Sequence, residues 1–490
     1  MSLLKAEDIA VQDGATVLLS PITLHLNPGE PLIVLGETGS GKSLLAQALM
    51  GTLPPELRAT GSITIGKRSL TASAPDQFRG LWGREITVLP QEPWLSLDPL
   101  MRARTQVGET HRLVRGLTAG DAARRADADL QALGLSGAER HYPHQLSGGM
   151  AQRVAIAAAR AGGARIVIAD EPTKGLDAAR RDDVADLLLS EMGSDGGLLV
   201  ITHDLALAHR IGGQLIVLRG GAVVEEGPTA RVLSAPKGAY TRELIAANPA
   251  HWARRAPVAR TGQAVVDAQR LGLARGGKML FEDVGFQIRP GGVFGVTGPS
   301  GCGKSSLGDA VLGLVPLTSG AVHRAPAAHP NAFQKLYQDP VAAFPRQRRL
   351  GQALGDVARL AHRSKAEIDE LMDRLGLDAA LLDRRPQAVS GGELQRLALL
   401  RVLLRQPAFV FADEPTSRLD PITQAKVIGL LTEIAEHEST AIMLVSHDHA
   451  LIDATADETL SLSAKGASLT SHRGFADREE PVVLSPRLGA

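Results

Sequence analysis

The sequence predicts an α/β fold that occurs twice in one chain of 490 residues. The first observation is a repeated glycine-rich segment, GETGSGKS at 36–43 and GPSGCGKS at 298–305. The second is a short apolar stretch directly before each copy, PLIVLG (31–36) and VFGVTG (293–298). Brief apolar runs bounded by glycine or proline are typical of buried parallel strands. We therefore expect each half to contain a parallel sheet with a glycine-rich loop after one strand.

Later segments extend this pattern in both halves. The segment after each loop carries apolar residues at helical spacing, and further apolar runs predict two more buried strands in each half. Alternating strands and helices are typical of α/β domains. The expected helices are 43–53 and 305–315, and the further strands are 165–170 and 198–204 in the first half and 408–413 and 442–448 in the second.

Composition narrows the class of protein. Lys+Arg and Asp+Glu both total 53, so no excess of positive charge favours nucleic acid as a partner. The single cysteine excludes an internal disulfide, a multi-cysteine zinc site and an iron–sulfur cluster held by the chain's own thiols. No apolar run approaches the roughly 20 residues that span a bilayer. We expect a soluble cytoplasmic chain that can dock on a membrane protein.

The expected domains are 1–245 and 263–490, joined by a linker at 246–262. The linker AANPAHWARRAPVARTG contains prolines and arginines and has no apolar period. A solvated linker is favoured over a membrane-facing or nucleic-acid patch. The tail after Gly466 is expected to be loosely structured.

Each glycine-rich segment fits the pattern GxxxxGK[ST], which binds phosphate. The glycines let the backbone curl so that N–H groups point inward, and the following helix N-terminus adds positive potential. Lys42 and Lys304 would reach the β- and γ-phosphates, and Ser43 and Ser305 would ligate magnesium. The residues expected to hold nucleotide are Gly36, Glu37, Thr38, Gly39, Ser40, Gly41, Lys42 and Ser43 in the first loop and Gly298, Pro299, Ser300, Gly301, Cys302, Gly303, Lys304 and Ser305 in the second.

Cys302 occupies a variable position of the pattern. A small spacer is favoured there over a redox sensor. Its thiol is nevertheless expected to be a point of chemical inactivation, because it lies so near the phosphates.

An acid pair follows one buried strand in each half: Asp170 and Glu171, then Asp413 and Glu414. The carboxyl ends of parallel strands are where ligands bind in open α/β sheets. The two aspartates fit magnesium coordination, and the two glutamates are placed to orient and polarise an attacking water. An isolated acid pair would more often be a solvated turn, but the repeated order of loop, strand and acids favours catalysis.

His203 and His447 each follow a later strand, within THD and SHD. A lone histidine there would more often be structural, but the paired positions favour contact with a γ-phosphate.

The segments LSGGM (146–150) and VSGGE (389–393) each precede a predicted helix. A serine and two glycines at a helix start offer a hydroxyl, free N–H groups and the positive end of the helix dipole, and so a second anion site. Taken singly, such a stretch is only a helix N-cap.

In this order, the motifs resemble the ATP-binding cassette (ABC) ATPases over nearly the whole chain, twice. The resemblance also includes Gln91 and Gln338, and turns carrying Asp177 and Asp420. It implies two tandem phosphate-loop nucleotide-binding domains, each with a RecA-like core, an antiparallel β-subdomain and a helical subdomain.

In this family, two such domains pair head to tail, so the resemblance implies intramolecular pairing of the two halves around ATP and Mg²⁺. Both halves keep every catalytic residue type, unlike fused sugar-importer ATPases, whose second site is usually degenerate. One implied site combines Lys42, Ser43, Gln91, Asp170, Glu171 and His203 with Ser390, Gly391 and Gly392, and the other combines Lys304, Ser305, Gln338, Asp413, Glu414 and His447 with Ser147, Gly148 and Gly149. The glutamines are also implied magnesium contacts.

Finer motifs are similar to the two ATPases of peptide and nickel importers. QEPWLSLDPLM (91–101) resembles the first and QDPVAAFP (338–345) the second. The implied partners are two permease subunits and an extracytoplasmic solute-binding protein, at the cytoplasmic face of a bacterial inner membrane. The alternative is an ABC-F-like translation factor on the ribosome, which the short, proline-bearing linker disfavours. A DNA-repair ATPase of the excision type would need zinc-binding cysteines.

The chain departs from this family in the early strands. The regions expected to stack adenine, 10–15 and 272–277, contain no aromatic residue, and Phe78 is the first aromatic residue in the chain. Aliphatic residues or Arg275 would then hold the base.

Overall fold

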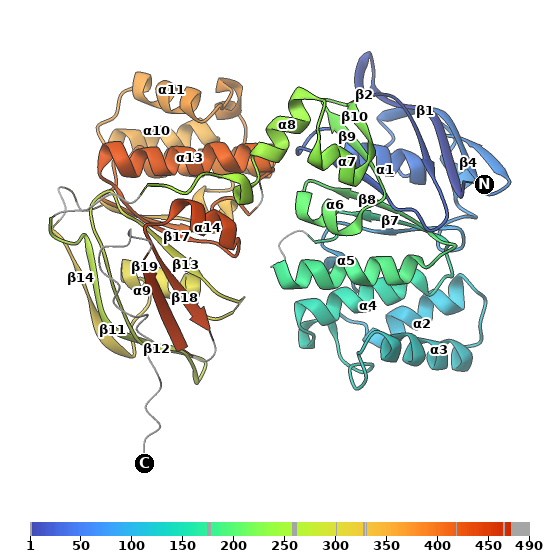
Figure 1. Ribbon diagram of the computed structural model, residues 1–490, viewed down its shortest axis with the longest axis horizontal. Coiled ribbons are helices and arrows are strands. Elements are labelled where there is room, and N and C mark those ends of the chain that lie inside the picture. The colour runs from blue at the N-terminus through green and yellow to red at the C-terminus, as the bar shows by residue number, and fades with distance from the viewer. Residues whose placement is uncertain are drawn as a thin grey trace. The chain divides into compact units, whose positions relative to one another are not determined.

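The computed structural model describes residues 2–173, 178–256, 262–299, 301–326, 329, 331–417, 419–463 and 466–471. The chain divides into two compact units, Met1–Ile245 and Ala246–Ala490. In both, a mixed, mostly parallel sheet carries the glycine-rich loop, as the repeated motifs predict (Figure 1).

The first unit contains two sheets. The antiparallel sheet has the order β2-β1-β4-β5, and the second sheet has the order β10-β9-β3-β8-β7-β6. The strands are β1 (Leu4–Asp13), β2 (Thr16–Leu26), β3 (Leu32–Gly36), β4 (Leu57–Ile65), β5 (Arg68–Thr71), β6 (Ile86–Leu89), β7 (Ile166–Asp170), β8 (Gly197–Thr202), β9 (Gln214–Arg219) and β10 (Ala222–Pro228). Strands β3, β6, β7, β8 and β9 are parallel, so their carboxyl ends meet at one edge.

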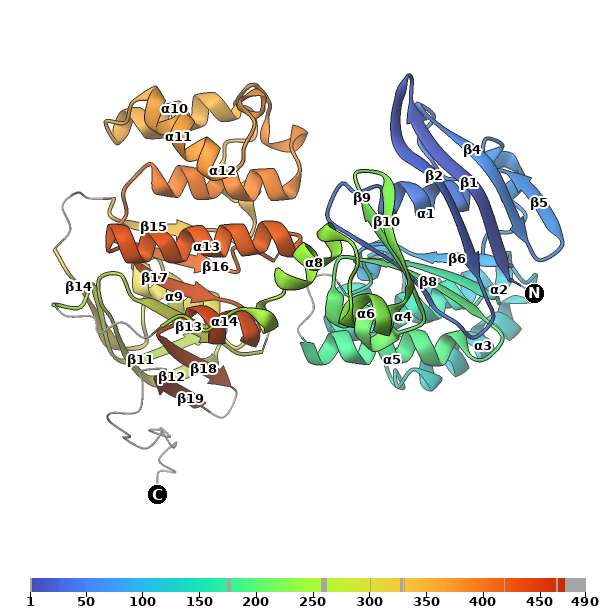
Figure 2. The same ribbon diagram turned by 45° about the horizontal axis from the view of Figure 1, so that its top comes forward.

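The helices of this unit include a separate helical part, α2, α3 and α4, with its own apolar core. In Figure 1 this part lies at the opposite end of the unit from β1, β2 and β4, and Figure 2 shows the same elements turned by 45°. The helices are α1 (Lys42–Met50), α2 (Ala103–Leu113), α3 (Ala119–Ala132), α4 (Gly148–Arg160), α5 (Ala178–Met192), α6 (Leu205–Ile211), α7 (Thr229–Ser234) and α8 (Ala239–Ala246). Asp177 lies outside the described residues.

The second unit repeats this plan. Its antiparallel sheet has the order β12-β11-β14, three strands against four in the first unit over the described residues, and its second sheet has the order β15-β16-β17-β13-β18-β19. The strands are β11 (Val266–Arg275), β12 (Lys278–Ile288), β13 (Val293–Thr297), β14 (Ser319–Arg324), β15 (Phe333–Leu336), β16 (Phe409–Asp413), β17 (Ala441–Val445), β18 (Glu458–Ser463) and β19 (Gly466–Ser471). The helices are α9 (Lys304–Leu312), α10 (Leu350–Leu360), α11 (Lys365–Arg374), α12 (Gly391–Leu403), α13 (Pro421–Glu438) and α14 (His449–Thr455).

The expectation of a loose tail after Gly466 is wrong at its start. Residues 466–471 form β19, which pairs antiparallel with β18 from Glu458↔Ser471 to Ser463↔Gly466. The segment GASLTS alternates small or polar residues with apolar ones, a pattern that suits an edge strand. Residues 472–490 lie outside the described part of the chain.

The two cores use different side chains at one matched position. A Cβ atom on Gly308 of α9 would overlap the ring of Phe411 in β16. In the first unit, Ala46 occupies the position that matches Gly308, four residues after the loop lysine. The fully buried Ile168 occupies the position that matches Phe411. A smaller helix residue thus accompanies a larger strand residue, which keeps the packed volume similar.

The described part of the predicted linker packs against the second unit. In residues 252–256, here called the anchoring segment, the Arg255 side chain is only 9% exposed. Its Nε pairs with Oε1 of Glu436 at 2.8 Å and its Nη1 with Oδ2 of Asp457 at 3.3 Å. The same Asp457 oxygen accepts the N–H of Val293 at 2.8 Å, at the start of β13. Two charged contacts therefore hold the anchoring segment to the second unit, one to α13 and one to Asp457, which also accepts the N–H at the start of β13.

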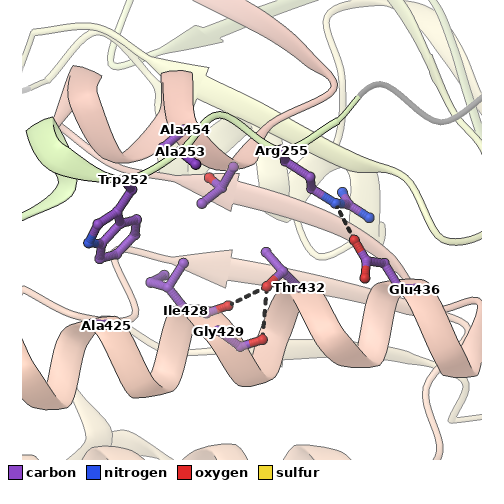
Figure 3. Close-up of a pocket in the computed structure, with 10 residues that line it drawn as sticks. Trp252, Ala253, Arg255, Ala425, Ile428, Gly429, Thr432, Glu436 and Ala454 are labelled. Carbon is purple, nitrogen blue, oxygen red and sulfur yellow. Dashed lines mark hydrogen bonds and ion pairs between the residues drawn. The ribbon is translucent and has the colours of Figure 1, made fainter. Parts of the chain in front are cut away.

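Figure 3 shows the pocket beside this segment, of about 350 Å³. Trp252 and Arg255 line one side and residues of α13 the other, where the Thr432 hydroxyl donates to the backbone carbonyls of Ile428 and Gly429. Of the described residues of the second phosphate loop, none lines this pocket. Residues 257–261 lie outside the described residues.

Across the described ranges, no helix has the length and apolar character needed to span a bilayer.

Candidate functional site

The first phosphate loop curls between β3 and α1. Gly36 must lack a side chain, because a Cβ atom there would overlap the carbonyl oxygen of Leu218 in β9. Gly41 has φ 97°, and a Cβ atom on it would lie 2.9 Å from Cδ1 of Leu19. Glycine alone tolerates both the left-handed backbone and the close approach. The glycines that the motif requires are thus needed for the loop's shape.

Lys42 is buried inside this loop. Its Nζ donates to the carbonyl oxygens of Gly36 and Glu37, both at 2.8 Å, and lies 4.0 Å from Oε1 of Glu171. The ammonium group is therefore already at the centre of the loop, where an anionic ligand would meet it.

Glu171 follows β7 in a strained conformation, with φ 48°. Its N–H donates to the carbonyl oxygen of Ile201 in β8 at 2.8 Å. The backbone strain of a non-glycine residue in this region persists only where surrounding contacts enforce it, typically at functional sites. Its Oε1 lies 2.8 Å from Nδ1 of His203, and Oε2 accepts the Thr202 hydroxyl at 3.4 Å. The structure thus brings together Lys42, Glu171 and His203, as the motif order predicts.

The second loop repeats the lysine geometry. Nζ of Lys304 donates to the carbonyl oxygens of Gly298 at 2.7 Å and Pro299 at 3.1 Å. The Ser305 hydroxyl donates to Oδ1 of Asp413 at 3.0 Å. These two oxygens, predicted as magnesium ligands, are neighbours, and hard oxygen donors suit that ion. Ser300 lies outside the described residues.

Glu414 has the same strained backbone as Glu171, with φ 46°, and its N–H donates to the carbonyl oxygen of Val445 at 3.0 Å. Its Oε2 accepts a hydrogen bond from Nε2 of Gln338 at 2.7 Å, and its Oε1 lies 3.7 Å from Nδ1 of His447. Glu171 thus contacts His203 and Thr202, and Glu414 contacts Gln338 and His447.

The electrostatics of the second site favour a charged glutamate. Burial by itself raises the pKa of Glu414, but the contact with His447 and the positive charges of His447 and Lys304 outweigh it, so the pKa lies below its ordinary value. The pairing with Glu414 raises the pKa of His447 despite burial. Each group therefore favours the charged form of the other.

Asp413 differs from its neighbour, because burial raises the pKa of its carboxyl group. The Ser305 hydroxyl and the charge of Lys335 only partly oppose this effect. A divalent cation beside Asp413 would favour its charged form.

The segments LSGGM (146–150) and VSGGE (389–393), here called the signatures, each contain a serine that caps a helix. Oγ of Ser147 accepts the N–H of Met150 at 3.3 Å at the start of α4, and Oγ of Ser390 accepts the N–H of Glu393 at 3.3 Å at the start of α12. In the second half Glu393 also accepts the N–H of Ser390 at 2.8 Å, which completes a capping box.

The signature glycines leave open space beside the backbone. A Cβ atom on Gly148, Gly149 or Gly391 would meet nothing within 4 Å, and one on Gly392 would lie 3.3 Å from Cδ2 of Leu419. A ligand could therefore approach the main chain here, and a role in nucleotide binding stays a prediction.

Sequence reasoning missed the glutamines of these two helices. Nε2 of Gln152 donates to the carbonyl oxygen of Pro172 at 2.9 Å, directly after Glu171. Nε2 of Gln395 donates to the carbonyl oxygen of Tyr337 at 3.3 Å, directly before Gln338. The repeated Gln-Arg pair that follows each signature was the available signal. These contacts connect each signature helix to the catalytic edge of its own sheet.

Gln91 follows β6 as Gln338 follows β15, and Thr38, Gly39, Gly301 and Gly303 lie in the loops. The first acid, Asp170, ends β7.

Cys302 is partly buried in the second loop. A Cβ atom on Gly298 would lie 2.8 Å from its Sγ. The matched position in the first loop is Ser40, which is 1% exposed and whose Oγ has no hydrogen-bond partner among the described residues. A small side chain is what this position needs, which supports the interpretation of Cys302 as a spacer.

Alkylation of Cys302 is expected to block nucleotide binding at the second loop, because the added group has no room beside Gly298. Labelling with N-ethylmaleimide should lower ATP hydrolysis, and prior incubation with ATP should slow the labelling. The Cys302→Ser chain, which copies Ser40, should remain active and resist the reagent. Equal inhibition of the serine variant would place the damage elsewhere.

These features define a chain with two phosphate-loop ATPase units. The ABC transporter family model matches residues 19–174 and 281–417, which include both loops and both acid pairs. The chain belongs to the ABC transporter family and is an ATPase.

Its relatives are transport proteins of similar organisation. The chain is 31% identical to the peptidoglycan transport ATP-binding protein YejF of Agrobacterium fabrum, over 94% of this chain and 90% of the relative. It is 30% identical to the glutathione import ATP-binding protein GsiA of Escherichia coli O157:H7, over 88% of this chain and 79% of the relative.

Among solved structures, the crystal structure of the complex of archaeal ribosomal stalk protein aP1 and the ribosome recycling factor aABCE1 contains a similar chain. The TM-score is 0.67 with 23% identity, over 94% of this chain and 89% of that one. This likeness concerns the fold alone.

Proposed function

We propose that this ATPase powers uptake of a peptide-class solute through an ABC importer. The observation that carries the proposal is that both units keep a complete catalytic set: a lysine inside each loop and a strained glutamate held beside a histidine. The two relatives named for peptidoglycan transport and glutathione import support the choice of an importer. The proposed partners are two permease subunits and an extracytoplasmic solute-binding protein, and the proposed location is the cytoplasmic face of the inner membrane.

We further propose that the ATP site at each phosphate loop is completed by the signature of the other half. The serine and glycines that start α12 would bind the nucleotide held by the first loop, and those that start α4 would bind the nucleotide held by the second. The open space beside Gly148, Gly149 and Gly391 supports this proposal, because phosphate oxygens need close access to backbone N–H groups.

The chain's own side chains divide the chemistry of the second site. Lys304 would bind phosphate oxygens and offset their charge. Glu414, kept ionised by its surroundings, would accept a hydrogen bond from the attacking water and orient it. His447 would hold Glu414 in place and donate toward the terminal phosphate. Magnesium, when bound by Ser305, Asp413 and Gln338, would neutralise phosphate charge; Ser43, Asp170 and Gln91 are its proposed ligands in the first site.

The translation-factor alternative has less support. The ribosome recycling factor shares the tandem fold at 23% identity, whereas the relatives at about 30% identity are named for transport.

The test is reconstitution. The chain would be co-expressed with candidate permease subunits of a peptide importer, and ATPase activity in proteoliposomes would be measured with and without the loaded solute-binding protein. The proposal expects the permeases to co-purify and the loaded binding protein to stimulate hydrolysis. A Lys42→Ala, Lys304→Ala chain should show no such stimulation. Co-purification with ribosomes in place of permeases would refute the proposal.

A further inference from the structure

Tyr240 reaches the first phosphate loop from a distant part of the sequence. It lies in α8, and the residue is only 3% exposed. Its hydroxyl oxygen accepts the N–H of Glu37, the second residue of the loop, at 3.0 Å. A loop N–H group is thus engaged by the protein itself.

Two hydrogen bonds hold the peptide group between Gly36 and Glu37, one at its N–H and one at its carbonyl oxygen. The N–H of the peptide between Gly36 and Glu37 donates to Tyr240, and its carbonyl oxygen, on Gly36, accepts a hydrogen bond from Nζ of Lys42 at 2.8 Å. The orientation of this peptide therefore decides where one acceptor for the Lys42 ammonium lies. We infer that Tyr240 is a positioning residue of the first ATP site, which keeps Lys42 aligned for phosphate. The inference rests on the proposed function of this loop in nucleotide binding.

The tyrosine is itself held firmly. The guanidinium of Arg219 lies over its ring, 4.7 Å from the centroid. The turn before α8 is fixed by Glu225, whose two carboxylate oxygens accept the N–H groups of Lys237 and Gly238, each at 2.9 Å. The hydroxyl is presented to the loop from a rigid support, as a positioning role requires.

The second loop explains why this support is needed only once. Pro299 stands where Glu37 stands in the first loop. Proline has no N–H to engage, and its ring fixes φ. The carbonyl oxygens of Gly298 and Pro299 still accept hydrogen bonds from Nζ of Lys304, at 2.7 and 3.1 Å. The proline ring restrains in the second loop the peptide that the Tyr240 hydrogen bond restrains in the first.

The test measures binding of a fluorescent ATP analogue, MANT-ATP, to the full chain. Lys304→Ala weakens the second site, so MANT-ATP binding to that chain measures the first site. Lys42→Ala weakens the first site, so binding to that chain measures the second. Tyr240→Phe keeps the ring and removes the hydroxyl. It should weaken binding about 2- to 12-fold in the Lys304→Ala chain, the effect of losing one hydrogen bond, and leave binding unchanged in the Lys42→Ala chain.

Glu37→Pro provides the decisive comparison, because it copies the second loop. In a Glu37→Pro, Lys304→Ala chain that binds MANT-ATP, Tyr240→Phe should change the affinity less than twofold. The inference is overturned if Tyr240→Phe leaves first-site binding unchanged, if it weakens both sites equally, or if it acts as strongly in the Glu37→Pro chain as in the chain that keeps the glutamate. Thermal unfolding of each chain shows whether the fold is intact. Absence of saturable binding in the Lys304→Ala chain with Tyr240 present would instead refute the proposed ATP site.

Discussion

Replacing Glu414 by glutamine is expected to lower ATP turnover at the second site by about 10²- to 10⁴-fold. Glutamine keeps the shape of the side chain and can still contact Gln338, but it loses the negative charge that the surroundings favour. Nucleotide binding should persist, because Lys304 and the loop backbone are unchanged. Single-turnover hydrolysis and MANT-ATP binding, measured on the same chain, separate the two effects.

The matched control for this change is Glu438→Gln, also in the second unit. Glu438 is half exposed and pairs with Arg374 on the surface at 3.9 Å, so its loss should leave turnover unchanged. Glu171→Gln makes the same change in the first site. Turnover of the Glu171→Gln, Glu414→Gln chain within tenfold of the unmodified chain would exclude both glutamates as catalytic groups.

Gly308→Ala is expected to destabilise the second unit by about 1–3 kcal/mol. The added methyl group would overlap the ring of Phe411, and both elements are packed in the core. The loss of stability would be measured by scanning calorimetry, as the shift of the unfolding transition relative to the unmodified chain.

A second substitution tests the cause. Phe411→Ile in the Gly308→Ala chain reproduces the pair Ala46 and Ile168 of the first unit and should recover part of the lost stability. Phe411→Ile alone should destabilise by leaving a cavity, so the two changes should be strongly non-additive. Purely additive effects would contradict the packing argument.

The fold and the centre of the site follow from local patterns. Each strand is contiguous with its motif, the loop after β3 and the acid pair at the end of β7, and parallel pairing brings the ends of these strands to one edge. That is why Lys42, Glu171 and His203 could be predicted to meet. The backbone strain at Glu171 and Glu414 has no such signature, because it depends on hydrogen bonds to a neighbouring strand.

Other features could not be predicted because they depend on contacts between distant segments. Tyr240 meets Glu37 across more than two hundred residues, and nothing in the local sequence around either residue marks the pair. The repeated Gln-Arg pair marks Gln152 in the sequence, but its partner, the carbonyl oxygen of Pro172, is brought to it only by the fold. Arg255 looks like one more solvated arginine until its two carboxylate partners are known.

The anchoring segment decides where the two halves can be cut apart. A second half that began at residue 263 would lose Arg255, and the poorly exposed Asp457 would then face the start of β13 without its cation. Loss of one partner of a desolvated charge pair is costly. A second half that began at Ala246 would carry its own counter-ion with it. For anyone who separates the halves to assign an activity to each, residues 246–256 therefore belong to the second piece, and a fragment without them would report damage to its fold rather than the properties of its ATP site.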